Sequence, residues 1–217
     1  FHVAVNDLES AVRITNNLRK WIAPLLALSA NSPFFAGYKT GMQSTRTLQF
    51  SSFPRTNIPP FIKDLLEYEN IIEKYIKSKT INKPGQIWWK IRPHLKFQTI
   101  EFRVCDIQRS ILKTEMLIAL VQSLVRTINE NYYEQNKNYN YEYLLDGLWK
   151  SSKFGINCKV IDPEDQKIIS MQKMIKRMLE YSKKSLLYFG NSHIIKYVED
   201  ILKNGNEASE QLKIYNK

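Results

Sequence analysis

A carboxylate and a guanidinium lie two residues apart in the stretch 97–106. Apolar and polar residues alternate there, which is typical of a β-strand with one buried face. Thr99, Glu101 and Arg103 then share the polar face. The residues predicted to face a core are Ile100, Phe102 and Val104. Because next-but-one residues of a strand are about 6–7 Å apart, we expect Glu101 and Arg103 to flank a ligand rather than to form an ion pair. The alternative is a solvent-facing strand with two surface charges.

A second stretch, 87–93, predicts another strand just upstream. Its alternation places Trp88, Lys90 and Arg92 on one face. The short link 93–96 would join it to the first stretch as a hairpin. We therefore expect these two basic side chains to stand beside Glu101 and Arg103.

The chain opens with a third alternating stretch, Phe1–Val5, in which His2 and Ala4 share one face. The three strands together would present a common polar surface. Its chemically useful residues are His2, Lys90, Arg92, Glu101 and Arg103. A histidine and a glutamate can hold a hard divalent cation, and arginines suit the oxygens of carboxylates and phosphates. The sequence thus predicts a metal ion and an anionic ligand on one sheet face.

Length and charge limit the class of protein. The chain has 217 residues, enough for one domain with a real core, and its 43% hydrophobic content excludes a disordered chain. With 32 basic and 21 acidic residues, the formal net charge is +11. A nucleic-acid-binding module would gather the basic residues in a patch, whereas here they are mixed with acids, as in Lys63-Asp64. We expect no nucleic-acid partner and a basic surface that attracts an anionic substrate.

Cysteine usage and hydropathy indicate a location. Cys105 and Cys158 are far apart and form no pattern of a zinc site or a disulfide framework, which favours a reducing cytoplasm. No apolar run reaches the length of a membrane span, and we expect no signal peptide. We therefore expect a cytoplasmic protein with no membrane partner. Because the chain opens inside a predicted strand, we also expect an N-terminal portion to precede Phe1.

The rest of the chain predicts one long loop and several helices. Residues 31–59 are rich in Ser, Thr, Gly and Pro, contain almost no acids and include Arg46; a loop of this length is usually functional. Other predicted elements are a helix capped by Asn6, a helix opened by Pro59-Pro60, a helix capped by Asp106 or Ser110 and ending near Asn131, a polar insert over 132–143, a helix over 144–153, a strand over 157–161, and helices over 168–189 and 192–203.

Several blocks of this sequence resemble, in order and spacing, the carboxylate-amine ligase branch of the type 2 glutamate–cysteine ligases. The blocks are Leu28–Phe34, Ser44–Thr47, Trp88-Trp89-x-x-Arg92-Pro93, Thr99–Asp106, and the tail Asn204–Asn206 with Gln211. The resemblance implies an α+β fold with the curved, mostly antiparallel sheet of the glutamine synthetase-like superfamily. It also implies that residues 1–217 are the C-terminal part of a single catalytic domain. The parts of this domain that it implies are strand 1–5, an active-site loop 31–59, strands 86–105 and a helical remainder 108–217.

The resemblance also implies an activity. Such ligases use ATP and Mg²⁺ (or Mn²⁺) to turn a carboxylate, usually the γ-carboxylate of glutamate, into an acyl phosphate, and an amine such as that of cysteine then displaces the phosphate to form an amide. This chemistry needs metal ions and protein cations to neutralise the phosphate charge. The partners expected are amino-acid substrates, the missing N-terminal portion or a partner chain, and further copies in a homo-oligomer.

Individual positions receive roles from the resemblance alone. His2 and Glu101 would be metal ligands, and Arg103 would contact the transferred phosphate or the substrate. Arg46 would hold the substrate carboxylate. The positions implied to bind ATP are Arg92, facing the nucleotide phosphates, and Lys90.

Three positions depart from the family pattern. Ala4 stands where a second histidine is expected, Asn6 where a glycine follows, and Lys153 where an arginine is usual. The acidic metal ligands of the family's early strands are also outside this chain. Two interpretations follow: an enzyme completed by another segment or chain, or a catalytically impaired paralogue that binds a partner or a ligand.

Overall fold

Three short strands form the central sheet of the computed structural model, which describes residues 1–131 and 136–216. They are β1 (His2–Ala4), β5 (Thr99–Phe102) and β4 (Ile91–His94), antiparallel and in the order β1-β5-β4. Two small ribbons pair β2 (Phe34–Phe35) with β3 (Tyr38–Lys39) and β6 (Lys159–Ile161) with β7 (Ile168–Ser170). The fold class is therefore α+β, with small antiparallel sheets and packed helices, as predicted.

The β4–β5 hairpin is where the sequence predicted it, but its first strand starts late. Residues Pro84–Gln86 form a 3₁₀ turn, η2, and β4 begins only at Ile91. Pro93 lies inside β4, which it can do because β4 is an edge strand and a missing N–H need not break the ladder there. The backbone N–H of Arg103 still donates to the Lys90 carbonyl at 2.8 Å, so Lys90 stands opposite Arg103 beyond the end of the strand.

A nearly continuous helical rod follows β1. It consists of α1 (Leu8–Leu18), the 3₁₀ turn η1 (Arg19–Trp21) and α2 (Ile22–Ser29). Asp7, and not Asn6 as predicted, caps α1: its carboxylate accepts a hydrogen bond from the backbone N–H of Ser10 at 2.7 Å. Every residue of α2 is buried, which fits an apolar helix inside a core.

The long loop 31–59 contains short elements of its own. Besides β2 and β3 it holds α3 (Thr45–Ser51), which Ser44 caps. The next helix, α4 (Leu65–Lys77), begins at its cap Asp64 and not at Pro59-Pro60. That prediction was wrong because a proline disfavours helical geometry in the residue before it, whereas the Asp64 carboxylate accepts from the N–H of Glu67 at 2.8 Å.

The second half of the chain is helical, with shifted boundaries. Its helices are α5 (Ile111–Glu130), α6 (Tyr141–Phe154), α7 (Met171–Tyr188), the 3₁₀ turn η3 (Ser192–Ile194), α8 (Ile195–Asn204) and α9 (Glu207–Tyr215). Ser110, one of the two predicted caps, caps α5. The helix predicted over 168–189 starts at Met171 because the three residues before it pair with β6. Within the predicted insert, residues 132–135 lie outside the described residues, and Asn140 caps α6.

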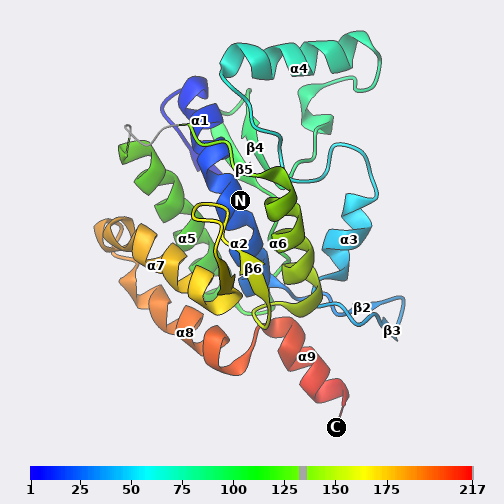
Figure 1. Ribbon diagram of the computed structural model, residues 1–217, viewed down its shortest axis with the longest axis vertical. Helices are drawn as coiled ribbons and strands as arrows, with labels where there is room; N and C mark the ends of the chain where they lie inside the picture. Colours follow the sequence, from blue (N-terminus) through cyan, green and yellow to red (C-terminus); the bar gives the residue numbers. More distant parts are fainter. Residues whose placement is uncertain (132–135, 217) are drawn as a thin grey trace.

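Helices cover the apolar face of the central sheet (Figure 1). Helix α1 lies against β4 and β5, α5 packs beside α1, and α7 and α8 pack on α5. Figure 1 also shows α4 and the β2–β3 hairpin projecting from this body, with α9 at the C-terminal end. The sheet contributes Ile91, Ile100 and Phe102 to the core, each at most 3% exposed. In the part of the chain that the structure describes, no helix is both long and apolar enough to cross a membrane.

Candidate active site

The face of the sheet opposite the apolar core carries the polar residues that the sequence predicted there. In the register of the sheet, Glu101 stands between His2 on β1 and Arg92 on β4. Two pairs further along, and therefore on the same face, Lys90 opposes Arg103. Because paired residues of antiparallel strands project to the same side, the predicted common surface is present.

Glu101 is the centre of this face, and both of its oxygens are engaged. Oε2 lies 2.5 Å from Arg92 Nη2, and Oε1 lies 2.7 Å from Arg103 Nη1. Burial opposes ionisation of Glu101, but the charges of the two arginines outweigh it, so the pKa of this carboxyl lies below its ordinary value. The expectation that Glu101 and Arg103 would not pair was wrong, because the long arginine side chain spans the separation of their backbones.

His2 completes the group on the opposite side of Glu101. Its Nδ1 is hydrogen-bonded to Thr99 Oγ1 at 2.9 Å, and its Nε2 lies 3.8 Å from Glu101 Oε1. Ala4 stands opposite Thr99, two pairs along the ladder and on the same face as His2. Among the described residues, no group of three or more His, Cys, Asp or Glu side chains could hold a metal ion. His2 and Glu101 therefore offer two ligands on their own.

Arg92 is held largely by the protein itself. Its side chain is 6% exposed, and Nη1 donates to the carbonyls of Gly85 at 2.9 Å and Pro84 at 3.4 Å, and to that of Ile87. Of its nitrogens, Nε alone has no hydrogen-bond partner among the described residues. Arg92 thus joins the η2 turn to Glu101, and the role of nucleotide contact stays a prediction.

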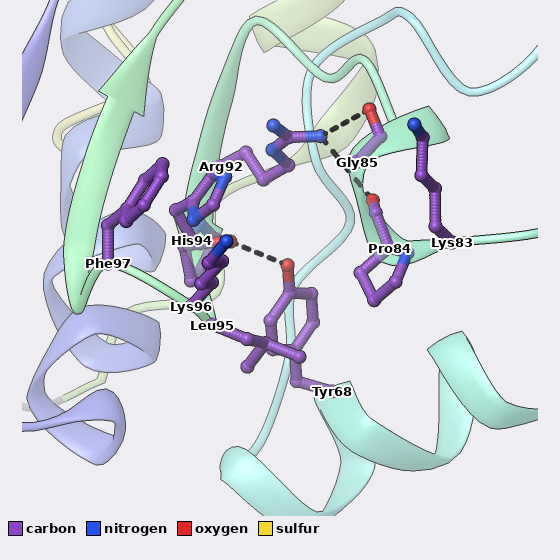
Figure 2. A pocket seen from close by; sticks show the side chains of 10 residues that line it. Tyr68, Lys83, Pro84, Gly85, Arg92, His94, Leu95, Lys96 and Phe97 are labelled. Atoms are coloured by element: carbon purple, nitrogen blue, oxygen red, sulfur yellow. Dashed lines mark hydrogen bonds between the residues drawn. The ribbon is translucent and has the colours of Figure 1, made fainter.

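A pocket of about 310 Å³ opens on the other side of Arg92 (Figure 2). Tyr68, Leu95 and Phe97 give it apolar walls, and Lys83 and Lys96 also line it. The remaining lining residues are Pro84, Gly85, Arg92, Pro93 and His94. The pocket is therefore mainly apolar, with cationic groups around it.

His94, which was not among the residues predicted from the sequence, lines this pocket and lies beside His2 of the sheet face. Its ring stacks on Phe97, with centroids 4.6 Å apart, and lies 5.4 Å from the ring of His2. Burial, followed by the charges of Arg92 and His2, lowers the pKa of His94. The signal in the sequence was its period: His94 lies two residues after Arg92, on the same strand face.

At the other end of the face lies a group of cations around Phe50 of α3. Lys90 Nζ is 5.4 Å from the centre of the Phe50 ring, and Arg103 Cζ is 5.7 Å from it. Lys90 is 1% exposed, and within residues 1–131 and 136–216 no carboxylate lies within ion-pair distance of its ammonium group. Burial, then the charge of Arg46, lowers the pKa of Lys90 to about 8, with Arg103 adding to the shift and Asp106 opposing it.

Arg46 joins this group from the first turn of α3. Its Nη2 donates to the Arg103 carbonyl at 3.1 Å, and its Nη1 lies 3.4 Å from Asp106 Oδ1. Arg46 remains 42% exposed, while the Asp106 side chain is 2% exposed. The structure therefore places Lys90 with Arg46 and Arg103, and not with the pocket beside Arg92.

Asp106 is a site residue that the sequence suggested only as a helix cap. Its Oδ2 accepts hydrogen bonds from the Asn31 N–H at 3.0 Å and from the Ser32 hydroxyl at 2.8 Å. It therefore ties loop 31–59 to the end of β5. The available signal was its place at the end of the alternating stretch 97–106 that carries Glu101 and Arg103. Lys153, the third departure, has its ammonium beside Gly41 of the same loop.

Comparison with known proteins identifies the family of this chain. The family model described as glutamate-cysteine ligase family 2 matches residues 1–217. The chain belongs to this family. A relative in Solibacter usitatus, named "Putative glutamate--cysteine ligase 2", is 35% identical over 217 residues. Relatives of the same name in Sorangium cellulosum and Gloeobacter violaceus are 32% and 33% identical.

The match covers the relatives only in part. It includes 99% of this chain but 56% of the Solibacter relative and 58% of the other two. The chain thus spans a little more than half the length of the curated family members that it matches.

Proposed function

We propose that this chain is the C-terminal part of a ligase that joins an amino-acid carboxylate to an amine at the cost of ATP. The reaction expected is that of glutamate with cysteine, through a γ-glutamyl phosphate. The observation that carries the proposal is the sheet face: a His–Glu pair stands next to three cations, Lys90, Arg46 and Arg103. Of these, Lys90 is 1% exposed and has no carboxylate within ion-pair distance among the described residues, so an anionic ligand would offset its buried charge.

The residues present fit a divalent metal ion in part. The bond of His2 Nδ1 to Thr99 leaves Nε2 directed toward Glu101, which is the usual arrangement of a metal-ligating histidine and its orienting partner. A Mg²⁺ or Mn²⁺ ion bound there would neutralise phosphate oxygens of ATP. Its further ligands would come from the nucleotide, from water or from a segment outside this chain.

The cation group would hold the reacting carboxylate. Arg103 would lie beside the transferred phosphoryl group, since it already touches Glu101, and the exposed guanidinium of Arg46 would bind the amino acid. Lys90, which is buried beside Phe50, would supply the third positive charge. Guanidinium groups suit both ligands because they offer paired donors to carboxylate and phosphate oxygens.

The pocket beside Arg92 would take the nucleoside. Its volume lies at the lower end of the range for small-molecule sites, and such sites are mostly apolar with a few polar groups. Lys83 and Lys96 would approach the phosphates. ATP would then run along the sheet face from this pocket toward Glu101, and the amino acid would meet it from the Arg46 end.

The proposed whole protein is larger than this chain. Its complete sheet would be the curved, mostly antiparallel sheet of the glutamine synthetase-like fold, in which β1, β5 and β4 form one side. The missing strands would supply the acidic metal ligands. We further propose a cytoplasmic homo-oligomer that binds no nucleic acid or membrane.

The test is product formation by the complete protein. Purified protein is incubated with ATP, Mg²⁺, glutamate and a set of amines that includes cysteine, and products are identified by mass spectrometry. An amide formed with equimolar ADP and phosphate supports the proposal. ATP binding without any amide product contradicts it.

One observation favours a second candidate, a catalytically impaired paralogue that binds a partner or a ligand. Ala4 offers no donor at a position that faces the site, and both oxygens of Glu101 are already paired with arginines. Such a protein would bind glutamate or ATP with measurable heat in a titration but would release no ADP.

A further inference from the structure

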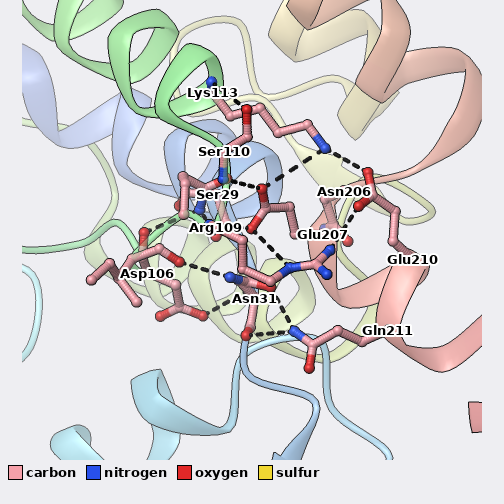
Figure 3. Close-up of polar contacts among 12 residues, drawn as sticks. Ser29, Asn31, Asp106, Arg109, Ser110, Lys113, Asn206, Glu207, Glu210 and Gln211 are labelled. Atoms are coloured by element: carbon pink, nitrogen blue, oxygen red, sulfur yellow. Dashed lines mark hydrogen bonds and ion pairs between the residues drawn. The ribbon is translucent and has the colours of Figure 1, made fainter. Parts of the chain in front are cut away.

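The C-terminal helix α9 is attached to the site through polar contacts (Figure 3). Gln211 donates from Nε2 to the backbone carbonyl of Asn31 at 3.0 Å and to its Oδ1 at 2.6 Å. On the other side, the Glu207 carboxylate accepts from the backbone N–H groups of Arg109 at 2.7 Å and Ser110 at 3.1 Å. Helix α9 therefore binds both Asn31, which contacts Asp106, and the backbone at Arg109 and Ser110, which follow Asp106 in the chain.

These contacts continue directly to Arg46. The N–H of Asn31 donates to Asp106 Oδ2, as does the hydroxyl of Ser32. The same Ser32 oxygen accepts from the Arg46 backbone N–H at 3.2 Å, while Asp106 Oδ1 meets the Arg46 guanidinium. The backbone and the side chain of Arg46 are thus both bound by residues of the Asn31, Ser32 and Asp106 cluster, which α9 contacts through Gln211.

The position of α9 is itself strongly determined. Asn206 is fully buried, donates to the Ala27 carbonyl at 2.9 Å and caps the helix by accepting from the Ser209 N–H. Gly205 has φ +99°, and a Cβ there would lie 2.7 Å from Ser209 Cβ. A helix that served only to cover apolar surface would not need this set of buried polar contacts.

We infer that α9 is a working part of the site: Gln211, acting through Asn31 and Asp106, is a positioning residue that holds Arg46 beside Arg103. Asp106 is the second positioning residue of the same path. In the proposed ligase, the substrate carboxylate would therefore depend for its binding on a helix that it does not touch.

The first test measures the position of Arg46 and is independent of activity. Arginine side chains of the complete protein are labelled with ¹⁵N, the Arg46 signal is assigned from Arg46→Lys, and its order parameter is measured. Gln211→Ala is expected to lower the order of Arg46. The matched control, Glu210→Gln, weakens the ion pairs of α9 with Arg109 and Lys113 but not the contact with Asn31, so it should leave the Arg46 signal unchanged. An unchanged Arg46 signal in Gln211→Ala overturns the inference.

The second test is a double-mutant cycle in steady-state kinetics, and it rests on the proposed function. Gln211→Ala should raise KM for the carboxylate substrate about tenfold while kcat and the KM for ATP stay constant. In an Arg46→Lys background, Gln211→Ala should change the KM for the carboxylate substrate by less than about twofold, because the guanidinium that Asp106 positions is then absent. Equal effects in both backgrounds refute the path to Arg46. If the wild type forms no amide, the ligase proposal fails, and the Arg46 signal still decides the inference.

Discussion

At the scale of single residues, the site is a balance between buried charges of opposite sign. Glu101 is bound by two arginines, whereas Lys90 has no acidic partner among the described residues. A buried charge without a partner costs stability. In the proposed ligase, an anionic ligand would offset the charge of this lysine, which is 1% exposed. The contrast between Glu101 and Lys90 leads to opposite predictions.

Replacing Glu101 by Gln should destabilise the protein and stop metal-dependent ATP turnover. The neutral amide leaves the buried Arg92 without its counter-charge, so we expect a loss of roughly 2–4 kcal/mol at pH 7. The pKa of Glu101 is lowered in the folded state, so its contribution is present above the unfolded-state pKa of about 4.3 and disappears as the pH falls through the folded-state pKa. Urea unfolding of both proteins between pH 7 and pH 3 measures this.

The control for Glu101→Gln is Glu69→Gln, at an exposed position of α4, which should change the unfolding free energy by less than about 0.5 kcal/mol. A Glu101→Gln protein that keeps both its stability and its ATP turnover would show that neither the ion pair nor the metal role is correct.

Replacing Lys90 by Met should stabilise the protein and abolish anion binding. The folded-state pKa of about 8 lies below the ordinary value of 10.5, so the charged lysine opposes folding below pH 8, and this cost is relieved as the pH rises from about 8 to 10.5. At pH 7 we expect a gain of roughly 1–3 kcal/mol. Thermal melts give the stability, and titration with glutamate or inorganic phosphate gives the binding.

Lys90→Arg is the companion variant for binding. In the wild type, anion affinity should fall as the pH rises through about 8, because Lys90 loses its proton. Arginine stays charged over this range, so the variant should bind with a flat pH profile. A Lys90→Met protein that melts early and still binds phosphate would make Lys90 a packing residue instead.

At the scale of elements, the alternation of 97–106 predicted both the buried and the polar face of β5, because burial of one face fixes the register of a strand. The first residues of the upstream strand could not be predicted, since the Arg92 side chain binds the carbonyls of Pro84, Gly85 and Ile87 at the η2 turn, and alternation does not encode such side-chain contacts. Local propensity likewise selected Asn6 and Pro59-Pro60 as helix starts, where Asp7 and Asp64 make the capping hydrogen bonds.

The contacts of α9 could not be predicted either, because they join residues that are far apart in the sequence. Asn206 and Gln211 were visible as part of a family resemblance, but their partners lie 179 and 180 residues away along the chain. The contacts of Asp106 with Asn31 and Ser32 likewise join residues 75 and 74 positions apart. Such long-range polar contacts leave no period in the sequence, in contrast to the alternating strand that carries Glu101.

At the same scale, Gly205→Ala should loosen α9. Both the backbone angle and the approach of Ser209 oppose a Cβ there, and we expect a loss of about 1–3 kcal/mol. Gly37→Ala is the matched control: it also has a positive φ, +84°, but meets nothing within 4 Å, so it isolates the backbone term. Equal melting temperatures for the two variants would contradict the close fit of α9 described above.

At the scale of the molecule, the chain covers 56–58% of the relatives compared, and its sheet has β1 at one edge. In the proposed ligase, His2 and Glu101 would be two metal ligands, which is fewer than a Mg²⁺ or Ca²⁺ site takes. We therefore interpret residues 1–217 as one side of a site that other strands complete.

The isolated segment 1–217 should accordingly bind ATP weakly and form no amide, while the complete protein forms it. The two proteins are compared at equal concentration, with folding of the segment checked by circular dichroism. Amide formation by a folded segment alone would mean that the described residues already contain every group the reaction needs.

The most direct test of the central claim follows an oxygen atom. Glutamate labelled with ¹⁸O in its γ-carboxylate is given to the complete protein with ATP, Mg²⁺ and the amine that proves to be the substrate, and the released phosphate is examined by mass spectrometry. If the carboxylate held by Arg46 and Arg103 attacks ATP, one labelled oxygen passes into each phosphate. Phosphate without label, released together with an amide product, would contradict the acyl-phosphate route and with it the assignment of this sheet face.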